Sequence, residues 1–391
     1  MTKRKLYAAA TVLALAILAS CGGGGGGGGE GTSNTAINSI KVMGDSLSDS
    51  GVFGSLGAGS GYGRIFSVQA SPGVPASIWT ERIAALVGVP ALCNFYTFTG
   101  TTFTATPTCS SFGVGSGRIN NSYQTSPENA APFSIPNQIA TAVSLGNFKS
   151  SDLILIDGGG NDAADLVEAY LNTSTDRGAY FATIVTSTLA PVPGINAYLV
   201  AQDLPSAGTL YMQTLADQFF NSIKNNALNH GATHVAVLNI PAITKTPRLQ
   251  MVLAGVEQAT NTATRTASEA LFNVWIKAFN DRLASDFSGD ARVVVVDFYN
   301  AFLDQVANPA QYGLTNVTTP ACPVVGTDAQ KLPLYDFETC TAASLSATPG
   351  KSSPDWWKTY GFSDGFHPTP YGYQLLSQLV SRSLAQAGWI Q

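Results

Sequence analysis

Three short runs of apolar residues constrain the fold of this chain more than any other feature of its sequence. They are DLILI at 152–156, HVAVLNI at 234–240 and RVVVVDF at 292–298. Each run is continuous rather than alternating, which is typical of strands that are buried on both faces of a parallel sheet. Longer stretches with helical periodicity separate the runs and predict βαβ units. We therefore expect an α/β protein with a mostly parallel central sheet covered by helices.

The remaining segments extend this pattern. A further strand is expected at 40–43, and helices are expected at 78–87 with Ser77 as N-cap, at about 197–228, at about 267–287 and from Pro370 onward. Two long segments rich in Gly, Thr and Pro, 89–130 and 308–360, interrupt the alternation. Unstructured loops of that length are uncommon in compact domains, so we interpret both segments as insertions over one end of the sheet.

Each insertion contains two cysteines, Cys93 and Cys109 in the first and Cys322 and Cys340 in the second. An even number of cysteines in an exported chain favours disulfides over free thiols. Three pairings are possible, and the local one is predicted because each local pair brackets a loop-like stretch. Zinc binding is the alternative, but no CxxC motif or cluster of histidines accompanies these cysteines.

The N-terminus has the features of an export signal. Basic residues at 3–5 precede an apolar run from Leu6 to Ala19, which as a helix would cover roughly 21 Å, less than the ~30 Å hydrocarbon core. Residues 1–20 are therefore predicted to be a signal peptide rather than a membrane span. LASC at 18–21 resembles the lipobox of bacterial lipoproteins, which implies cleavage before Cys21 and lipidation of that residue.

The segment after Cys21 predicts how the protein is attached and where it resides. Residues 22–29 are consecutive glycines, so we interpret 21–36 as a lipidated, flexible linker and 37–391 as the folded domain. By the lipoprotein resemblance, Gly22 in place of an aspartate implies the outer membrane, with the domain in the periplasm or on the cell surface. The lipid anchor would be the contact with the membrane, and we expect a monomer.

The overall charge argues against nucleic acid as a partner. The chain has 20 Lys and Arg against 25 Asp and Glu, with no basic cluster.

Two polar motifs follow directly after predicted strands. GDSLSDSG at 44–51 follows the strand at 40–43, and DGGGND at 157–162 follows the strand at 152–156. Ligands of open α/β sheets sit outside the carboxyl ends of the strands, which is where both motifs should lie. The sequence therefore predicts a functional site at this edge.

The sequence contains three histidines, which limits the candidates for a catalytic base. His230 and His234 have structural explanations, because they stand at the expected end of a helix and at the start of a strand. His367 lies in DGFHPTPYGY at 364–373, on a loop ahead of a helix that Thr369 is suited to cap. Asp364 is close enough to accept a hydrogen bond from the imidazole and orient it.

At this point the motifs resemble a known family. GDSL, GGND and DGFHP, in this order, are similar to blocks I, III and V of the SGNH/GDSL hydrolases. The resemblance covers nearly all of the mature chain and implies a three-layer α/β/α sandwich of the flavodoxin-like type. It implies that Ser46 is the nucleophile, His367 the general base and then acid, and Asp364 the residue that orients the histidine.

The same resemblance implies an oxyanion hole built from three donors. They are the backbone N–H of Ser46, the side-chain amide of Asn161 and a backbone N–H from block II, which SFGVGSGRI at 111–119 resembles. One alignment puts Ser116 at the block II donor position and another puts Gly115 there.

The other polar residues of the two motifs are expected to be structural. Asp162 is predicted to cap the helix that follows it, and Asp49 to be a hydrogen-bonding partner. Ser48 and Ser50 are interpreted as loop or helix-start residues.

Together these features predict an exported, lipid-anchored serine ester hydrolase, a carboxylesterase or lipase that acts on small-molecule or lipid esters through an acyl-enzyme. No metal and no cofactor are expected. A carbohydrate O-acetylesterase is the alternative, and an inactive polymer-binding lipoprotein is a further one. Aromatic residues of the insertions are interpreted either as lining an acyl groove or as packing the insertions down; they are Phe95, Tyr96, Phe98, Phe103, Phe112, Trp356, Trp357 and Tyr360.

Overall fold

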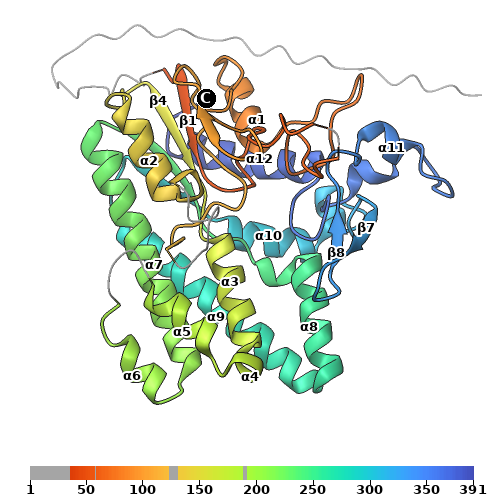
Figure 1. Ribbon diagram of the computed structural model, residues 1–391. Coiled ribbons are helices and arrows are strands. Elements are labelled where there is room, and N and C mark those ends of the chain that lie inside the picture. Colours follow the sequence, from red (N-terminus) through yellow and green to blue (C-terminus); the bar gives the residue numbers. More distant parts are fainter. Residues whose placement is uncertain (1–35, 58, 123–130, 188–191) are drawn as a thin grey trace, which may run out of the picture. The chain divides into compact units, whose positions relative to one another are not determined.

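The computed structural model describes residues 36–57, 59–122, 131–187 and 192–391. At the centre of the described part is a four-stranded sheet in the order β1-β4-β5-β6 (Figure 1). Its strands are β1 Ser39–Met43, β4 Asp152–Ile156, β5 His234–Leu238 and β6 Val293–Val296. Neighbouring strands all run parallel. The predicted parallel sheet and its strands are confirmed.

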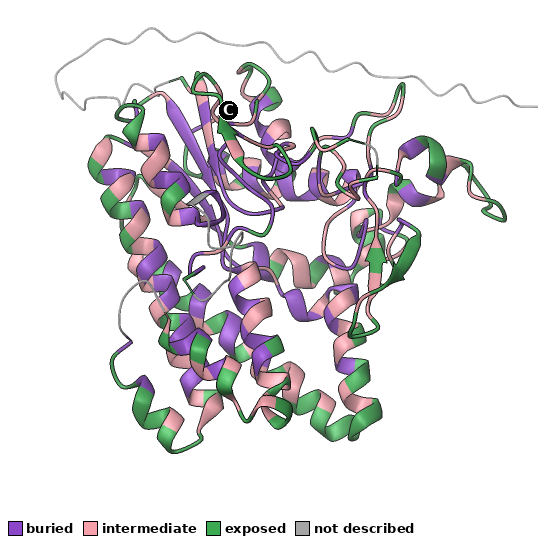
Figure 2. Ribbon diagram, viewed as in Figure 1, coloured by how far each residue is buried: buried purple, intermediate pink, exposed green. Residues whose placement is uncertain are grey.

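Apolar residues alternate between two cores because successive strand side chains point to opposite faces. In β4, Leu153 and Leu155 pack with the helices α1 (Trp79–Leu86) and α12 (Pro370–Gln386). Ile154 and Ile156 belong to the core on the other face. The helices that contribute to that core include α2 Ile135–Ser144, α3 Gly160–Leu171, α7 Leu204–Asn226 and α9 Thr262–Asp286. The strands are thus buried between two helical layers (Figure 2), as expected for a three-layer sandwich.

The remaining elements are short, apart from two helices that border the functional site. Those two are α8 Pro247–Ala259 and α10 Phe298–Ala307. The other α-helices are α4 Thr173–Asp176, α5 Ala179–Thr186, α6 Ile195–Val200 and α11 Ala342–Ser346. Single 3-10 turns lie at Ala131–Phe133, Leu228–His230, Ile243–Lys245, Pro309–Tyr312 and Trp356–Thr359.

Two predictions about helix ends are wrong. The N-cap of α1 is Ile78 rather than Ser77, and the side chain of Glu81 accepts the Ile78 N–H at 3.2 Å. The single helix expected at about 197–228 is divided into α6 and α7. Asp203 caps α7 by accepting the N–H of Ser206 at 3.2 Å, so the chain leaves helical geometry between the two helices.

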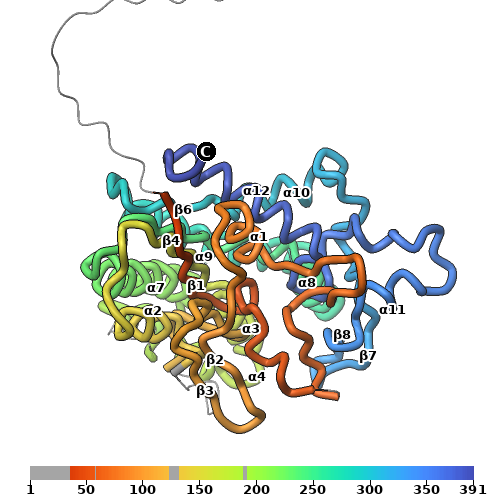
Figure 3. The backbone as a smooth tube through the Cα atoms, turned by 90° about the horizontal axis from the view of Figure 1, so that it is seen from above, coloured from red at the N-terminus to blue at the C-terminus, as the bar shows by residue number. Residues whose placement is uncertain are grey.

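The insertions carry one hairpin each, in different parts of the molecule (Figure 3). The first contains β2 Tyr96–Phe98 and β3 Phe103–Ala105, and the second contains β7 Val324–Thr327 and β8 Pro333–Tyr335. Disulfides join Cys93 to Cys109 and Cys322 to Cys340. The local pairing is therefore confirmed.

The first insertion also borders the sheet. Val42 of β1 donates its N–H to the Ser110 carbonyl at 3.0 Å, and Phe112 donates its N–H to the Val42 carbonyl at 2.7 Å. These bonds add a single parallel bridge beside β1. The insertion is thereby fastened to the strand whose end carries Ser46.

The predicted signal peptide, Cys21 and most of the predicted linker lie outside the described residues. In the part that the structure describes, no helix is both long enough and apolar enough to cross a membrane.

Candidate active site

Ser46 lies on a tight turn directly after β1. The N–H of Ser48 donates to the carbonyl of Asp45 at 3.1 Å, and the N–H of Leu47 donates to Asp45 Oδ1 at 2.9 Å. Position 44 has no room for a side chain, because a Cβ there would lie 1.9 Å from Asp157 Oδ1. The turn therefore leaves Ser46 at the carboxyl edge of the sheet, where the sequence predicts a site.

His367 and Asp364 complete a hydrogen-bonded chain with Ser46. His367 Nε2 lies 2.8 Å from Ser46 Oγ, and His367 Nδ1 lies 2.8 Å from Asp364 Oδ2. Asp364 Oδ1 also accepts the backbone N–H groups of Phe366 at 2.8 Å and His367 at 2.6 Å. The structure thus brings together the three residues that the motifs predict, across 321 positions of sequence.

The electrostatics of this pair favour the charged forms. Burial opposes the charge of both groups, but their mutual attraction and hydrogen bond outweigh it. The pKa of the Asp364 carboxyl is therefore lowered, and the pKa of the His367 imidazole is raised above its ordinary value. Such a carboxylate stabilises the imidazolium that forms when the ring accepts a proton.

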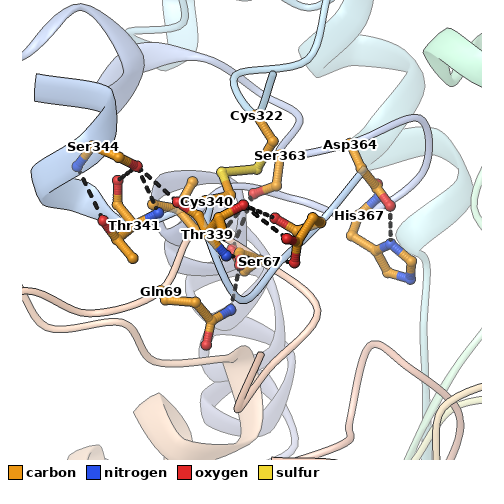
Figure 4. The surroundings of a disulfide bond; sticks show 12 residues. Ser67, Gln69, Cys322, Thr339, Cys340, Thr341, Ser344, Ser363, Asp364 and His367 are labelled. Atoms are coloured by element: carbon orange, nitrogen blue, oxygen red, sulfur yellow. Dashed lines mark hydrogen bonds and ion pairs between the residues drawn. A yellow bond between two sulfur atoms is a disulfide. The ribbon is translucent and has the colours of Figure 1, made fainter. Parts of the chain in front are cut away.

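The loop that carries His367 lies beside the second disulfide (Figure 4). The N–H of Cys322 donates to the Ser363 carbonyl at 2.8 Å, and the N–H of Ser363 donates to the His367 carbonyl at 2.7 Å. Thr369 caps α12 by accepting the N–H of Gly372 at 3.1 Å, as predicted. The loop that carries His367 is therefore held at both ends.

Asn161 and Ser116 face the same pocket as Ser46 and His367. The Asn161 side-chain amide donates to the carbonyl of Gly117 at 2.9 Å and approaches Asp45 Oδ2 at 3.4 Å. Ser116 has a φ of 66°, an unusual backbone conformation for a residue other than glycine.

Gly115 occupies a different position from Ser116. Its N–H donates to Asp49 Oδ2 at 2.8 Å, and it is not among the residues that line the pocket. A Cβ on Gly115 would lie 2.4 Å from the ring of Phe66. Of the two block II alternatives, Ser116 is the one that borders the pocket.

The prediction that Asp162 caps α3 is wrong. Its carboxylate instead accepts the N–H groups of Ile119 at 3.0 Å and Asn120 at 2.8 Å, and Gly159 is the N-cap. Burial raises the pKa of Asp162 to about 7. The side chain therefore connects α3 to the first insertion. The sequence did not predict this role, because it depends on a contact between distant segments.

Asp49 is a structural hydrogen-bonding partner, as predicted. It accepts the N–H groups of Gly51 at 2.8 Å and Val52 at 2.7 Å in addition to that of Gly115. Burial raises its pKa to about 6. Ser50 and Ser111 share a hydrogen bond at 3.1 Å, which gives Ser50 a structural role as well.

Asp157 is a site residue that the sequence analysis did not single out. It lies at the end of β4, accepts a hydrogen bond from Ser48 Oγ, and accepts the N–H of Asp45 at 3.3 Å. Burial and the nearby Asp45 carboxylate raise its pKa well above the ordinary value. Its place at the start of DGGGND, directly after a buried strand, was the available signal.

The other two histidines lie elsewhere. His230 Nδ1 is 3.2 Å from Asn147 Oδ1, and His234 packs edge-on against Trp389 at the opposite end of the sheet. No group of three or more His, Cys, Asp or Glu residues in the described ranges is arranged to hold a metal ion.

The pocket beside Ser46 has a volume of about 170 Å³ and mostly apolar walls. Phe66, Phe298, Phe302 and Phe366 are its aromatic lining. None of the eight aromatic residues singled out in the insertions lines it, and Phe95 and Phe112 stack within the core at 4.6 Å. For these residues the packing interpretation is supported. The sequence analysis did not identify Phe298 and Phe302. It predicted the strand before α10 but not that α10 would line the pocket.

Comparisons with known proteins agree with the motifs. Residues 40–380 match the model of the family described as GDSL-like Lipase/Acylhydrolase. The chain is 28% identical over 184 residues to the GDSL esterase/lipase At1g29670 of Arabidopsis thaliana, covering 45% of this chain and 46% of that protein. It is 27% identical over 199 residues to the GDSL esterase/lipase EXL2 of Arabidopsis thaliana, covering 49% and 45%. The chain therefore spans less than half the length of these curated relatives. Because the family model covers most of the chain, the chain belongs to the GDSL-like lipase/acylhydrolase family.

Proposed function

We propose that the protein is a serine ester hydrolase of the carboxylesterase or lipase type, with Ser46 as nucleophile. The observation that carries the proposal is the hydrogen-bonded chain from Asp364 through His367 to Ser46 beside an apolar pocket. A serine hydroxyl is a weak nucleophile at neutral pH and needs a base within hydrogen-bond reach. His367 Nε2, at 2.8 Å from Ser46 Oγ, meets this requirement.

In the first half of the proposed reaction, Ser46 Oγ attacks the ester carbonyl carbon while its proton moves to His367 Nε2. Asp364 keeps the imidazole in the required orientation and stabilises its positive charge. The tetrahedral intermediate collapses when its bond to the leaving oxygen breaks, and His367 returns the proton to the departing alcohol. In the second half, a water molecule gives a proton to His367 and attacks the acyl carbon. The bond from this carbon to Ser46 Oγ then breaks as His367 returns the proton to Oγ, which releases the acid and free Ser46.

We assign the oxyanion hole to the N–H groups of Ser46 and Ser116 and the side-chain amide of Asn161. The pocket-facing position of Ser116 supports this choice, as does the use of the Gly115 N–H by Asp49. Each preorganised donor is worth roughly 2.7–4 kcal/mol of the barrier.

The test is hydrolysis of p-nitrophenyl esters by the full chain and by Ser46→Ala, with Ser55→Ala as a matched control on an exposed serine. We expect Ser46→Ala to lose turnover by about a millionfold and Ser55→Ala to keep it. A fluorophosphonate should add to Ser46 and to no residue of Ser46→Ala, as read by peptide mass spectrometry. Equal turnover by the wild type and Ser46→Ala would refute the assignment.

We also propose that the protein is exported and attached to the outer membrane through lipidated Cys21. The basic start, the short apolar run and LASC at 18–21 support this proposal. The mass of the N-terminal peptide after expression of the full chain in a bacterium tests it, because an unmodified Cys21, or a peptide that still contains Ser20, would contradict it.

A further inference from the structure

The backbone of Gly44, two residues before Ser46, is held by a side chain from a helix. The N–H of Gly44 donates to Gln138 Oε1 at 2.8 Å, and the carbonyl of Gly44 accepts a hydrogen bond from Gln138 Nε2 at 3.0 Å. Gln138 lies on α2, which packs against β1. One side-chain amide thus binds both polar groups of a backbone residue, as a residue of a neighbouring antiparallel strand would.

Gly44 needs such a partner because it follows an edge strand. β1 is the first strand in the order of the central sheet, so only one of its sides is covered by another strand of that sheet. On the other side, the first insertion forms a bridge at Val42, and the N–H of Val114 donates to the Gly44 carbonyl at 3.1 Å. The Gly44 N–H is bonded to Gln138 instead. A buried backbone N–H without a partner costs free energy, so Gln138 stabilises this end of β1.

Gln138 is completely buried, which is uncommon for a glutamine. A buried amide is tolerated where its polar atoms have hydrogen-bond partners. In addition to the two bonds with Gly44, Gln138 Nε2 donates to the carbonyl of Pro132 at 2.8 Å. An apolar side chain of the same size would fill this volume without needing three partners. Packing alone therefore does not explain an amide at this position.

Pro132 connects Gln138 to the segment that carries a proposed oxyanion donor. The carbonyl of the next residue, Phe133, accepts the N–H of Arg118 at 2.9 Å. The Arg118 guanidinium in turn donates to the carbonyl of Ser116 at 2.8 Å. Gln138 therefore bonds to the segment that leads into the proposed nucleophile and to a segment that is fastened to the proposed oxyanion hole.

We propose that Gln138 is a positioning residue for ester hydrolysis, which fixes the turn that carries Ser46 relative to the donors of the oxyanion hole. Gln138 does not line the pocket, so it acts on the substrate through the backbone that leads to Ser46. A displacement of about 1 Å between reacting groups can lower a rate about a hundredfold. The inference rests on the proposed function and adds to it a residue that lies outside the GDSL, GGND and DGFHP motifs.

Asn280 is a matched control, because it binds a backbone residue in the same way at the end of another strand. The N–H of Ile240, two residues after β5, donates to Asn280 Oδ1 at 2.9 Å. Asn280 Nδ2 donates to the carbonyl of Ile240 at 2.8 Å, and Asn280 is also buried. Ile240 leads into neither the proposed hydrogen-bonded chain nor the proposed oxyanion hole. Loss of the Asn280 amide should therefore affect stability without affecting the position of Ser46.

The test replaces each amide by an apolar side chain of similar size, in Gln138→Met and Asn280→Leu. Both variants of the full chain should have lower melting temperatures, since each leaves backbone groups without partners. With p-nitrophenyl acetate, well below those temperatures, Gln138→Met should lower kcat and kcat/KM by the same factor of about 30 to 100. Asn280→Leu should lower either quantity by less than about threefold. The rate at which a fluorophosphonate adds to Ser46 should fall in Gln138→Met by a factor similar to that for kcat.

Gln138→Asn keeps the amide but shortens the side chain by one methylene, and it extends the test to a milder change. It should lower kcat about three- to tenfold, again with little change in KM, and it replaces Gln138→Met if that variant does not fold. A folded Gln138 variant that loses no more kcat than Asn280→Leu would overturn the positioning role alone. Absence of Ser46-dependent turnover of any ester by the wild type would overturn the proposed function instead.

Discussion

Asp162, which follows Asn161 in the chain, and Asp364, which bonds to His367, are both buried carboxyl groups, yet their pKa values move in opposite directions. The pKa of Asp162 is raised to about 7, chiefly by burial, whereas that of Asp364 is lowered although burial opposes its charge. Each accepts two backbone N–H groups, so backbone hydrogen bonds do not account for the difference. What Asp364 has in addition is the imidazole of His367 at 2.8 Å.

The carboxyl groups on the two sides of the site have different roles. On the side of Ser46, Asp162 joins α3 to the first insertion, and Asp49 joins the serine turn to Gly115 of the same insertion. On the other side, Asp364 is paired with a ring that must change its charge during the proposed reaction. A buried carboxyl that only organises backbone can be neutral, but one that stabilises an imidazolium must be ionised.

The largest expected effect comes from changing the two carboxyl groups in the same way. Asp364→Asn should lower kcat about 10³- to 10⁴-fold, because a neutral amide neither stabilises the imidazolium nor holds the required tautomer. Asp162→Asn should lower kcat less than about tenfold, since Asp162 bonds to the backbone of Ile119 and Asn120 and does not contact Ser46 or His367. Steady-state kinetics at pH 7 measure both values.

A circular dichroism spectrum of each variant serves as the control for folding. Equal losses of kcat in two well-folded variants would remove the distinction between the two sides of the site.

The next expected effect is that the stability and the activity of the protein change in opposite directions as the pH rises. With a folded pKa of about 7 and an ordinary value of 3.8, Asp162 keeps its proton in the folded protein at pH values where the unfolded chain has lost it. Its contribution to stability is therefore complete below about pH 4 and is lost as the pH rises to about 7, by about 4 kcal/mol. Activity should change the other way, since His367 must be neutral to act as a base and its pKa is raised above 6.5.

Denaturant unfolding of the wild type and Asp162→Asn from pH 4 to pH 8 isolates the first effect, because the difference between their unfolding free energies should change with pH. A pH profile of kcat/KM reports the second and should rise through a pKa above 6.5. A constant stability difference would show that Asp162 does not titrate as proposed. A kcat/KM that falls between pH 6 and pH 8 would contradict the role of His367 as base.

The central sheet and the meeting of Ser46, His367 and Asp364 could both be predicted from the sequence, for a common physical reason. Continuous apolar runs such as DLILI have few alternatives to buried strands, and parallel strands present their carboxyl ends at one edge. Motifs that follow such strands must then lie near each other. Ser46 and Asn161 reach the pocket in this way.

Features that depend on contacts between distant segments were not predictable in the same way. Local propensity indicates a cap for Asp162, but the carboxylate bonds to Ile119 and Asn120 because the fold brings the first insertion against α3. The pocket aromatics Phe298 and Phe302 likewise depend on how α10 is placed relative to the sheet. A single sequence carries no local signal for such placements.

The smallest expected effect compares the two disulfides, one on each side of the site. They close loops of similar length, with sequence separations of 16 and 18. Removing either pair should therefore lower the free energy of unfolding by a similar amount, about 3 kcal/mol.

The contacts of the two disulfides differ. The N–H of Cys322 bonds to the carbonyl of Ser363, next to Asp364. Phe337, between Cys322 and Cys340 in the sequence, packs on His367 with ring centres 5.7 Å apart. Cys322→Ala with Cys340→Ala should therefore lower kcat/KM about three- to tenfold, and Cys93→Ala with Cys109→Ala less than twofold. Unfolding midpoints and ester hydrolysis well below those midpoints measure the two quantities separately. If the first pair affected kcat/KM as strongly as the second at equal loss of stability, the second insertion would have no special part in holding the histidine.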